Sequence, residues 1–235
     1  MSSVQQLLTL CARTHLHPAD AEALARCAAQ ITDWSNVAAR AEAQGLGPLL
    51  ARHLQTAGVA PPKAIRRQLQ ALTVRHCHAF AVRMRALAQI LAAFEQAGIP
   101  VRVLKGAALA HLIYPAPGLR SMRDLDLLVS PADARRAQTL LAQLGFTAPL
   151  PPPGAPLPDK HLTPATRADA GLTVTVELHT NLFHAFERAS FTLADACGPP
   201  LVFSVNGVAA QTLGPEDMLW HLCRHIAYHA SIWEP

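Results

Sequence analysis

The stretch Arg120-Ser-Met-Arg-Asp124-Leu-Asp126-Leu-Leu-Val129 is the part of the chain from which its fold can best be argued. It is an apolar run of strand length that begins with two aspartates at alternate positions. Because successive side chains of a strand point to opposite faces, both carboxylates are expected on one face. Adjacent carboxylates repel each other, and their burial requires a compensating cation. The candidates are Arg120 and Arg123 as salt-bridge partners, or a divalent metal ion such as Mg²⁺, which prefers carboxylate oxygens.

A candidate phosphate-binding turn lies upstream of this strand. Val101–Leu104 is predicted to form a short strand, Lys105-Gly106 to end it and Ala107–Tyr114 to form a helix. A glycine at such a turn lets backbone N–H groups approach a phosphate, and the helix N-terminus attracts the anion. Lys105 adds a positive charge, and lysine occurs only three times among the twenty basic residues. The alternative is that Gly106 only makes the turn and that Lys105 is a surface residue.

A third acid follows downstream. Thr173–Leu178 alternates as a strand, and Glu177 lies near its C-terminal end. His179 shares the face of Glu177, where it could orient the carboxylate or contact a substrate. The alternatives are that Glu177 is exposed on an edge strand and that His179 is structural.

The ordered segments together resemble a known family. They are Leu104-Lys-Gly-Ala-Ala-Leu109, Tyr114, Arg120, Asp124-Leu-Asp126-Leu-Leu-Val129, Gly145-Phe146, Glu177-Leu-His179, Leu213-Gly-Pro-Glu-Asp217 and His225. In this order, over roughly residues 34–230, they resemble the uncharacterised nucleotidyltransferase family of the DNA polymerase β superfamily. The resemblance implies a nucleotidyltransferase fold with a mixed sheet, and a two-metal mechanism in which Asp124, Asp126 and Glu177 hold Mg²⁺ or Mn²⁺. It names no substrate.

The phosphate turn departs from the wider superfamily, which usually has Gly-Ser or Gly-Gly there. Gly106 is followed by alanine. Without a serine hydroxyl, the expected nucleotide contacts are the backbone at Gly106, Lys105, and Arg120 or Arg123. The chain also ends soon after the helix that carries His225, whereas relatives tend to continue with more helices.

The predicted function is the metal-dependent transfer of a nucleoside monophosphate from an NTP to an unknown acceptor, with release of pyrophosphate. Asp124 and Asp126 would hold the metal at the triphosphate, and Glu177 would complete a second metal site or accept the acceptor's proton. Lys105 and the Gly106 backbone would grip the β- and γ-phosphates. The alternative is a catalytically degenerate nucleotidyltransferase fold that binds a nucleotide or a protein. The missing serine and the early chain end favour the alternative, and three clustered acids argue against it.

The fold class expected from the pattern is α+β. A helical region over residues 1–97 precedes a nucleotidyltransferase-like domain over residues 98–235, which has a small mixed sheet and a C-terminal helix. Apolar periodicity predicts short helices within residues 3–58 and a long helix over residues 63–97. Beyond the strands named above, the further predicted elements are a helix at Pro131–Leu144, a hairpin of Val202–Val205 and Val208–Leu213 around Asn206-Gly207, and a last helix from Pro215 to about Ala230.

Composition excludes several classes of protein. Hydrophobic residues make up 51% of the 235 residues, which is enough for a sizeable core and argues against general disorder. No apolar run reaches the ~18 residues that a membrane helix needs, and the first twenty residues lack the pattern of a secretory signal. Five scattered cysteines favour neither a disulfide framework nor a zinc ribbon, and they indicate a reducing, cytoplasmic location.

Nucleic acid as a partner has little support. The net charge is only +4, and an RNA-binding module over residues 60–90 would rest on arginines alone, because Phe80 is the one aromatic residue there.

The histidines of the last predicted helix are not expected to bind metal. His221, His225 and His229 repeat at four-residue spacing without the glutamate of a metalloprotease motif. No hydrolase, P-loop or dinucleotide-binding motif is present.

Overall fold

The computed structural model describes residues 2–152, 154–187 and 189–231, of which residues 228–231 are described by their backbone. Its helices and strands follow an α+β order, which confirms the predicted fold class. They form two units: Met1–Ala81 with Leu109–Met122, and Val82–Ala108 with Arg123–Pro235. The division into domains at residue 97 stays a prediction.

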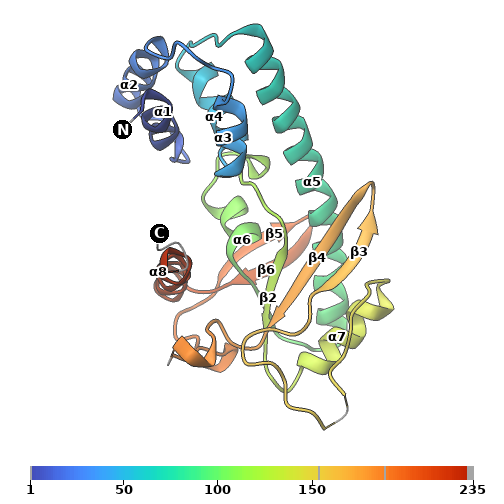
Figure 1. Cartoon of the computed structure of the whole chain (residues 1–235). Coiled ribbons are helices and arrows are strands. Elements are labelled where there is room, and N and C mark those ends of the chain that lie inside the picture. Colours follow the sequence, from blue (N-terminus) through green and yellow to red (C-terminus); the bar gives the residue numbers. More distant parts are fainter. Residues whose placement is uncertain (1, 153, 188, 232–235) are drawn as a thin grey trace. The chain divides into compact units, whose positions relative to one another are not determined.

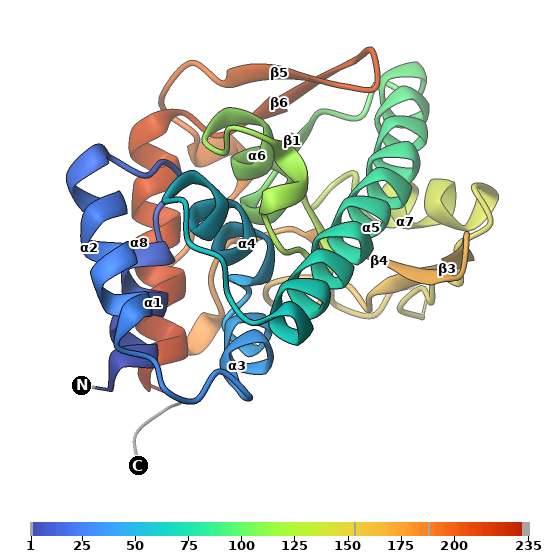
Figure 2. The same ribbon diagram turned by 90° about the horizontal axis from the view of Figure 1, so that it is seen from above.

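The first unit consists of short helices, as the sequence predicts. They are α1 (Ser3–Cys11), α2 (Pro18–Ala29), α3 (Val37–Ala43), α4 (Gly47–Thr56), the first part of α5 (Lys63–Gln96) and the end of α6 (Lys105–Leu112). Figure 2 shows α1 beside α2. Leucines such as Leu7, Leu24 and Leu50 form the core, onto which Ile65 and Leu69 of α5 pack. These apolar residues recur at three- and four-residue steps, so each helix buries one face.

The long helix α5 ends where the sequence indicates. It stops at Gln96, and Gly98 has a φ of +66°, a left-handed conformation that glycine adopts without steric cost. The second part of α5 belongs to the second unit. There its buried face includes Met84, Leu87 and Phe94.

The second unit is built on a four-stranded sheet with the order β1-β2-β4-β3, of which β2, β4 and β3 are labelled in Figure 1. Its strands are β1 (Val101–Val103), β2 (Leu125–Val129), β3 (Ala165–Asp169) and β4 (Leu172–His179). β2 runs parallel to β4, while β1 pairs antiparallel with β2, and β3 antiparallel with β4. Every residue of β2 is buried, which explains why a central strand carries a nearly continuous apolar run. Helix α7 (Ala134–Gln143) contacts β3 and β4.

Strand β3 was missed by the sequence analysis. It pairs with β4 through a two-residue turn, Ala170-Gly171, at which both residues have positive φ (46° and 79°). As an edge strand it is only partly buried, so it lacks the apolar alternation that predicts a strand. The glycine of the turn was the available signal.

A second, two-stranded sheet confirms the predicted hairpin. β5 (Leu201–Val205) pairs with β6 (Val208–Thr212), and the turn residues Asn206 and Gly207 have φ of 49° and 87°. Asn-Gly suits this turn because both positions require positive φ. Helix α8 (Pro215–Ser231) follows, with Glu216 and Asp217 in its first turn. Among the described residues, no helix combines the length and the apolar character that crossing a membrane requires.

Candidate functional site

The pairing of β2 with β4 brings two of the predicted acids together. Asp126 lies directly opposite Glu177, and Leu128 lies opposite His179. Paired residues of parallel strands point to the same face, and neighbouring strands are about 5 Å apart. One ligand atom each from Asp126, Glu177 and His179 therefore lies within 4.8 Å of the others. The strand of Glu177 thus lies beside the strand of Asp126.

Asp126 is the buried centre of this group. Its side chain is 5 % exposed, and its Oδ1 accepts hydrogen bonds from His179 Nε2 at 2.8 Å and from Lys105 Nζ at 2.9 Å. Burial by itself would raise the pKa of Asp126, but the hydrogen bond from His179 and the charge of Lys105 lower it below its usual range. The carboxylate is therefore ionised at neutral pH, and two basic side chains stabilise its charge.

Glu177 is more accessible than Asp126. Its side chain is 24 % exposed, and its Oε2 lies 3.5 Å from the same Nε2 of His179. Interaction with this imidazole lowers the pKa of Glu177, against burial and the negative charge of Asp126, which raise it. Because Nε2 faces two ionised carboxylates, it carries the proton, and Nδ1 of His179 is a buried atom without a hydrogen-bond partner among the described residues.

Asp124 precedes β2 and is influenced by the same charges. Burial, followed by the charges of Asp126 and Glu177, raises the pKa of Asp124, while Lys105 acts in the opposite direction. Arg83 of α5 also faces it, since the charge of Asp124 raises the pKa of this guanidinium against the effect of burial. Asp124 is thus the least compensated of the three acids, and its role as a metal ligand stays a prediction.

Lys105 occupies the strained position of the predicted phosphate turn. It is the first residue of α6 and has a φ of 43°, a left-handed conformation that is uncommon outside glycine. The helix thus begins at Lys105, whereas the sequence predicted a start at Ala107 after a turn at Gly106. The amide of Leu104 donates to the carbonyl of Asp126 at 2.9 Å, which holds the turn against β2. Such strain at a site of charged groups is typical of functional positions.

Of the two predicted arginines, Arg123 does not compensate the aspartates. Among the described residues of the second unit, Arg123 forms no ion pair with Asp124 or Asp126. Arg123 is exposed, and its carbonyl accepts a hydrogen bond from Arg83. Arg120 follows a short helical turn in the first unit. The salt-bridge alternative is therefore wrong for Arg123, and it stays untested for Arg120. The contact of either arginine with a nucleotide stays a prediction.

Lys160 is a site residue that the sequence analysis did not select. Burial and the charge of Lys105 lower its pKa, while Glu187, Asp126 and Glu177 raise it, so its amine lies within range of the acids. Its carbonyl accepts from the amide of Thr180 at 2.8 Å, directly after β4. The rarity of lysine was the available signal, because two of the three lysines of the chain, Lys105 and Lys160, are found here.

His221 of α8 is a second residue that the sequence did not indicate as part of this site. It is 2 % exposed, and neither ring nitrogen has a hydrogen-bond partner in the part of the chain that the structure describes. Burial, followed by the charge of Lys105, lowers the pKa of His221 to about 3, so the ring is neutral at physiological pH. The ring centroids of His221 and His225 are 6.2 Å apart. The side chain of His229 lies outside the described residues, so the predicted absence of a zinc site on this face is untested.

The donor set fits a hard divalent cation. Asp126 and Glu177 supply ionised carboxylate oxygens, which Mg²⁺ and Mn²⁺ prefer, and His179 adds an imidazole, which transition metals accept. Lys105 and His179 stabilise the negative charge of Asp126 by themselves. A cation that binds here has to take over part of that stabilisation from Lys105 and His179, whose nitrogens lie 2.9 and 2.8 Å from Asp126 Oδ1.

Comparison with known proteins identifies the family. Residues 30–234 match the model of a family described as uncharacterised nucleotidyltransferase. The match covers most of the chain, so the chain belongs to this family of nucleotidyltransferases, as the resemblance of its motifs indicated. Neither the curated proteins nor the solved structures give a significant match.

Proposed function

We propose that the chain transfers a nucleoside monophosphate from an NTP to an acceptor and releases pyrophosphate, at a centre formed by Asp124, Asp126 and Glu177. The observation that carries this proposal is the pairing of Asp126 with Glu177 across β2 and β4, together with the hydrogen bond from Lys105 to Asp126. Three acids and a lysine around one strand pair supply both the ligands for a cation and a positive charge for a phosphate chain.

Asp126 and Glu177, whose ligand atoms lie within 4.8 Å of each other and of His179, would hold Mg²⁺ or Mn²⁺ through carboxylate oxygens. Asp124 would join them from the residue before β2, and His179 would either join them or orient Asp126. The cation would neutralise the triphosphate charge and polarise the phosphorus that is attacked. Catalysis of phosphoryl transfer rests mainly on such positioning and charge neutralisation.

Lys105 would move from Asp126 to the β- and γ-phosphates when a nucleotide binds. The amine lies 2.9 Å from Asp126 at the start of α6, where backbone N–H groups of the first helical turn also favour an anion. Lys160 would add a second positive charge, since the charges of Asp126 and Glu177 raise its pKa.

Glu177 would serve either as a ligand of a second metal ion or as the base that accepts the proton of the acceptor. It is ionised, and it is more exposed than Asp126, so an acceptor can approach it. The acceptor oxygen forms a bond with the α-phosphorus, its proton passes to Glu177, and the bond from the α-phosphorus to the leaving pyrophosphate breaks.

A second candidate function is a nucleotide-binding module without catalysis. The contacts of Lys105 and His179 with Asp126 favour it, because they stabilise the carboxylate without a cation. Thermal unfolding separates the two: an enzyme should gain stability from Mg²⁺ or Mn²⁺ chiefly when an NTP is present, whereas a module that binds nucleotide alone should not need the cation.

The decisive experiment is incubation of the chain with each α-labelled NTP, a divalent cation and a cell extract, beginning with ATP. Labelled product should form with the unaltered chain and with Glu95→Gln, which removes an exposed carboxylate of α5. It should be absent with Asp126→Asn. Label transfer by Asp126→Asn at the unaltered rate would refute the proposed centre.

We further propose a cytoplasmic location. The support is that all five cysteines are free thiols, two of them buried and three exposed. Exposed free thiols are typical of proteins that work in a reducing compartment.

A further inference from the structure

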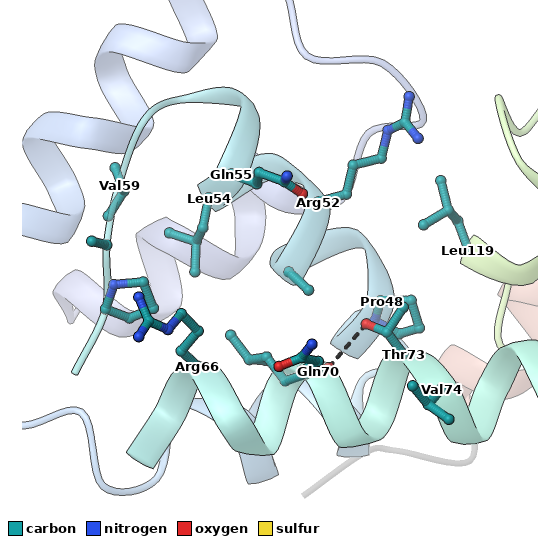
Figure 3. A pocket seen from close by; sticks show the side chains of 14 residues that line it. Pro48, Arg52, Leu54, Gln55, Val59, Arg66, Gln70, Thr73, Val74 and Leu119 are labelled. Atoms are coloured by element: carbon teal, nitrogen blue, oxygen red, sulfur yellow. Dashed lines mark hydrogen bonds between the residues drawn. The ribbon is translucent and has the colours of Figure 1, made fainter. Parts of the chain in front are cut away.

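A cavity of about 690 Å³ lies in the first unit, between α4 and the first turns of α5 (Figure 3). All of its lining residues belong to that unit: Pro48, Ala51, Arg52, Leu54, Gln55, Val59, Ala60, Pro61, Arg66, Leu69, Gln70, Thr73, Val74 and Leu119. None of them takes part in the metal centre described above. The volume falls in the range of about 300–1,000 Å³ that small-molecule sites occupy.

The walls of the cavity are mostly apolar. Leu54 and Leu69 of the lining are buried, whereas Val74 is 65 % exposed although it is a large apolar side chain. Thr73 does not contribute a free donor, because its hydroxyl donates to the carbonyl of Leu69. The apolar surface favours the hydrocarbon or ring part of a ligand, since burial of that surface is favourable by about 25 cal/mol per Å².

Two arginines supply uncompensated positive charge. Figure 3 shows Arg66 on the side of Val59, and Arg52 on the side of Leu119. Neither guanidinium forms an ion pair or a hydrogen bond within the described residues, and the lining contains no acid. Gln55 is the other polar residue that α4 contributes to the lining, beside Arg52.

The acids of this unit are already engaged elsewhere. Asp20 pairs with Arg13, Glu22 with Arg26, and Glu42 with Arg75 and His76, while Asp33 accepts from the amide of Ser35. The four acids of the unit thus leave Arg52 and Arg66 without a carboxylate. A ligand that brings its own negative charge would complement them, because a guanidinium binds carboxylate and phosphate through two parallel hydrogen bonds.

We propose that this cavity binds a small organic anion, a molecule with an apolar ring or chain that carries a carboxylate or a phosphate. The apolar part would lie against Leu54, Leu69 and Val74, and the anionic group would pair with Arg66 or Arg52. A nucleic acid strand fits the lining less well, since no aromatic side chain is present on which a base could stack.

The test is calorimetric titration of the full chain, in EDTA to keep metal out of the acidic centre, with three probes. 1-Naphthyl phosphate has both the ring and the charge, 1-naphthol has the ring alone, and inorganic phosphate has the charge alone. Naphthyl phosphate should bind at least about tenfold more tightly than either of the others. At least one of Arg52→Gln and Arg66→Gln should weaken it by about three- to tenfold, as expected for one charge-assisted contact at an exposed side chain, and unchanged affinity in both would overturn the proposal.

Arg67→Gln is the matched control, since Arg67 lies next to Arg66 on α5 but does not line this cavity. The affinity of Arg67→Gln for naphthyl phosphate should be unchanged. Ala51→Trp adds a large side chain to the lining, so its affinity should fall while its thermal unfolding temperature is retained. Equal binding of naphthol and naphthyl phosphate would overturn the proposal. The proposal would also be overturned if Arg67→Gln lost as much affinity for naphthyl phosphate as Arg66→Gln, or if Asp126→Asn lost affinity for it. Tighter binding of a short RNA, dependent on Arg67 as much as on Arg66, would overturn it as well. If the chain failed to transfer label from an NTP in the nucleotidyltransferase assay, the expected binding of naphthyl phosphate to this cavity would be unchanged.

Discussion

Replacement of Lys105 by methionine removes the positive charge closest to the buried carboxylate. Lys105 and Asp126 are 15 % and 5 % exposed and are joined at 2.9 Å, so solvent screens the pair only weakly. Breaking a buried pair costs about 3–5 kcal/mol. We expect the lower end, about 3 kcal/mol in the free energy of unfolding, because His179 still donates to the same oxygen. At about 2–4 °C per kcal/mol for a chain of this size, the unfolding temperature falls by about 6–12 °C.

The loss should depend on pH in a defined direction. The pKa of Asp126 is lowered in the folded state, so its contribution to stability is present above the unfolded pKa of about 3.9 and is lost as the pH falls below that value. In Lys105→Met the pKa of Asp126 rises, and the carboxyl can take a proton instead of remaining an uncompensated charge. The difference between the two proteins should therefore be largest near neutral pH and should shrink below about pH 4.

The assay is urea unfolding at several pH values, with and without Mg²⁺ or Mn²⁺. Lys63→Met serves as the control, because Lys63 is an exposed residue at the start of α5, and its removal should change stability by less than about 0.5 kcal/mol. A divalent cation should restore part of the stability of Lys105→Met, since the uncompensated Asp126 becomes a stronger ligand. If Lys105→Met is as stable as the unaltered chain near neutral pH and does not respond to a cation, the reasoning about this pair is refuted.

Three further outcomes are expected. Asp124→Asn should abolish label transfer and raise the unfolding temperature by about 1–3 °C, because burial and two neighbouring acids already disfavour its charge; a fall in the unfolding temperature would contradict this. Glu177→Gln should retain NTP binding but reduce the transfer rate by about 10²–10⁴-fold, with Glu95→Gln as the control, and an unaltered rate would exclude Glu177 as the base. His221→Phe should lose less stability than the unaltered chain when the pH falls below about 6.5. The pKa of His221 is lowered to about 3 on folding, so the unfolded chain takes up the proton first as the pH falls. The free energy of unfolding of the unaltered chain should therefore fall by about 3–5 kcal/mol by about pH 3. Parallel pH profiles of the two proteins would show that the ring is not buried in a neutral form.

Local patterns determined much of the fold and part of the site. Strand β2 has the bounds that its apolar run predicts, α5 ends at the expected glycine, and Asn206-Gly207 forms the expected turn. Strand alternation also placed Glu177 on the face of Asp126, given only that β4 is the neighbour of β2. These features depend on backbone preferences and on side-chain periodicity, which a short stretch of sequence contains in full.

Only the tertiary structure decided which groups compensate the acids. The sequence suggested Arg120 and Arg123, which are close to Asp124 along the chain, but the cations found at the site are Lys105 and the neighbouring Lys160. The electrostatic interaction between two groups depends on their distance in space and on the surrounding dielectric, and neither is related to their separation in sequence. The charge of the cavity between α4 and α5 is likewise a property of the tertiary structure. Arg52 and Arg66 are uncompensated because the acids of the unit pair with other groups.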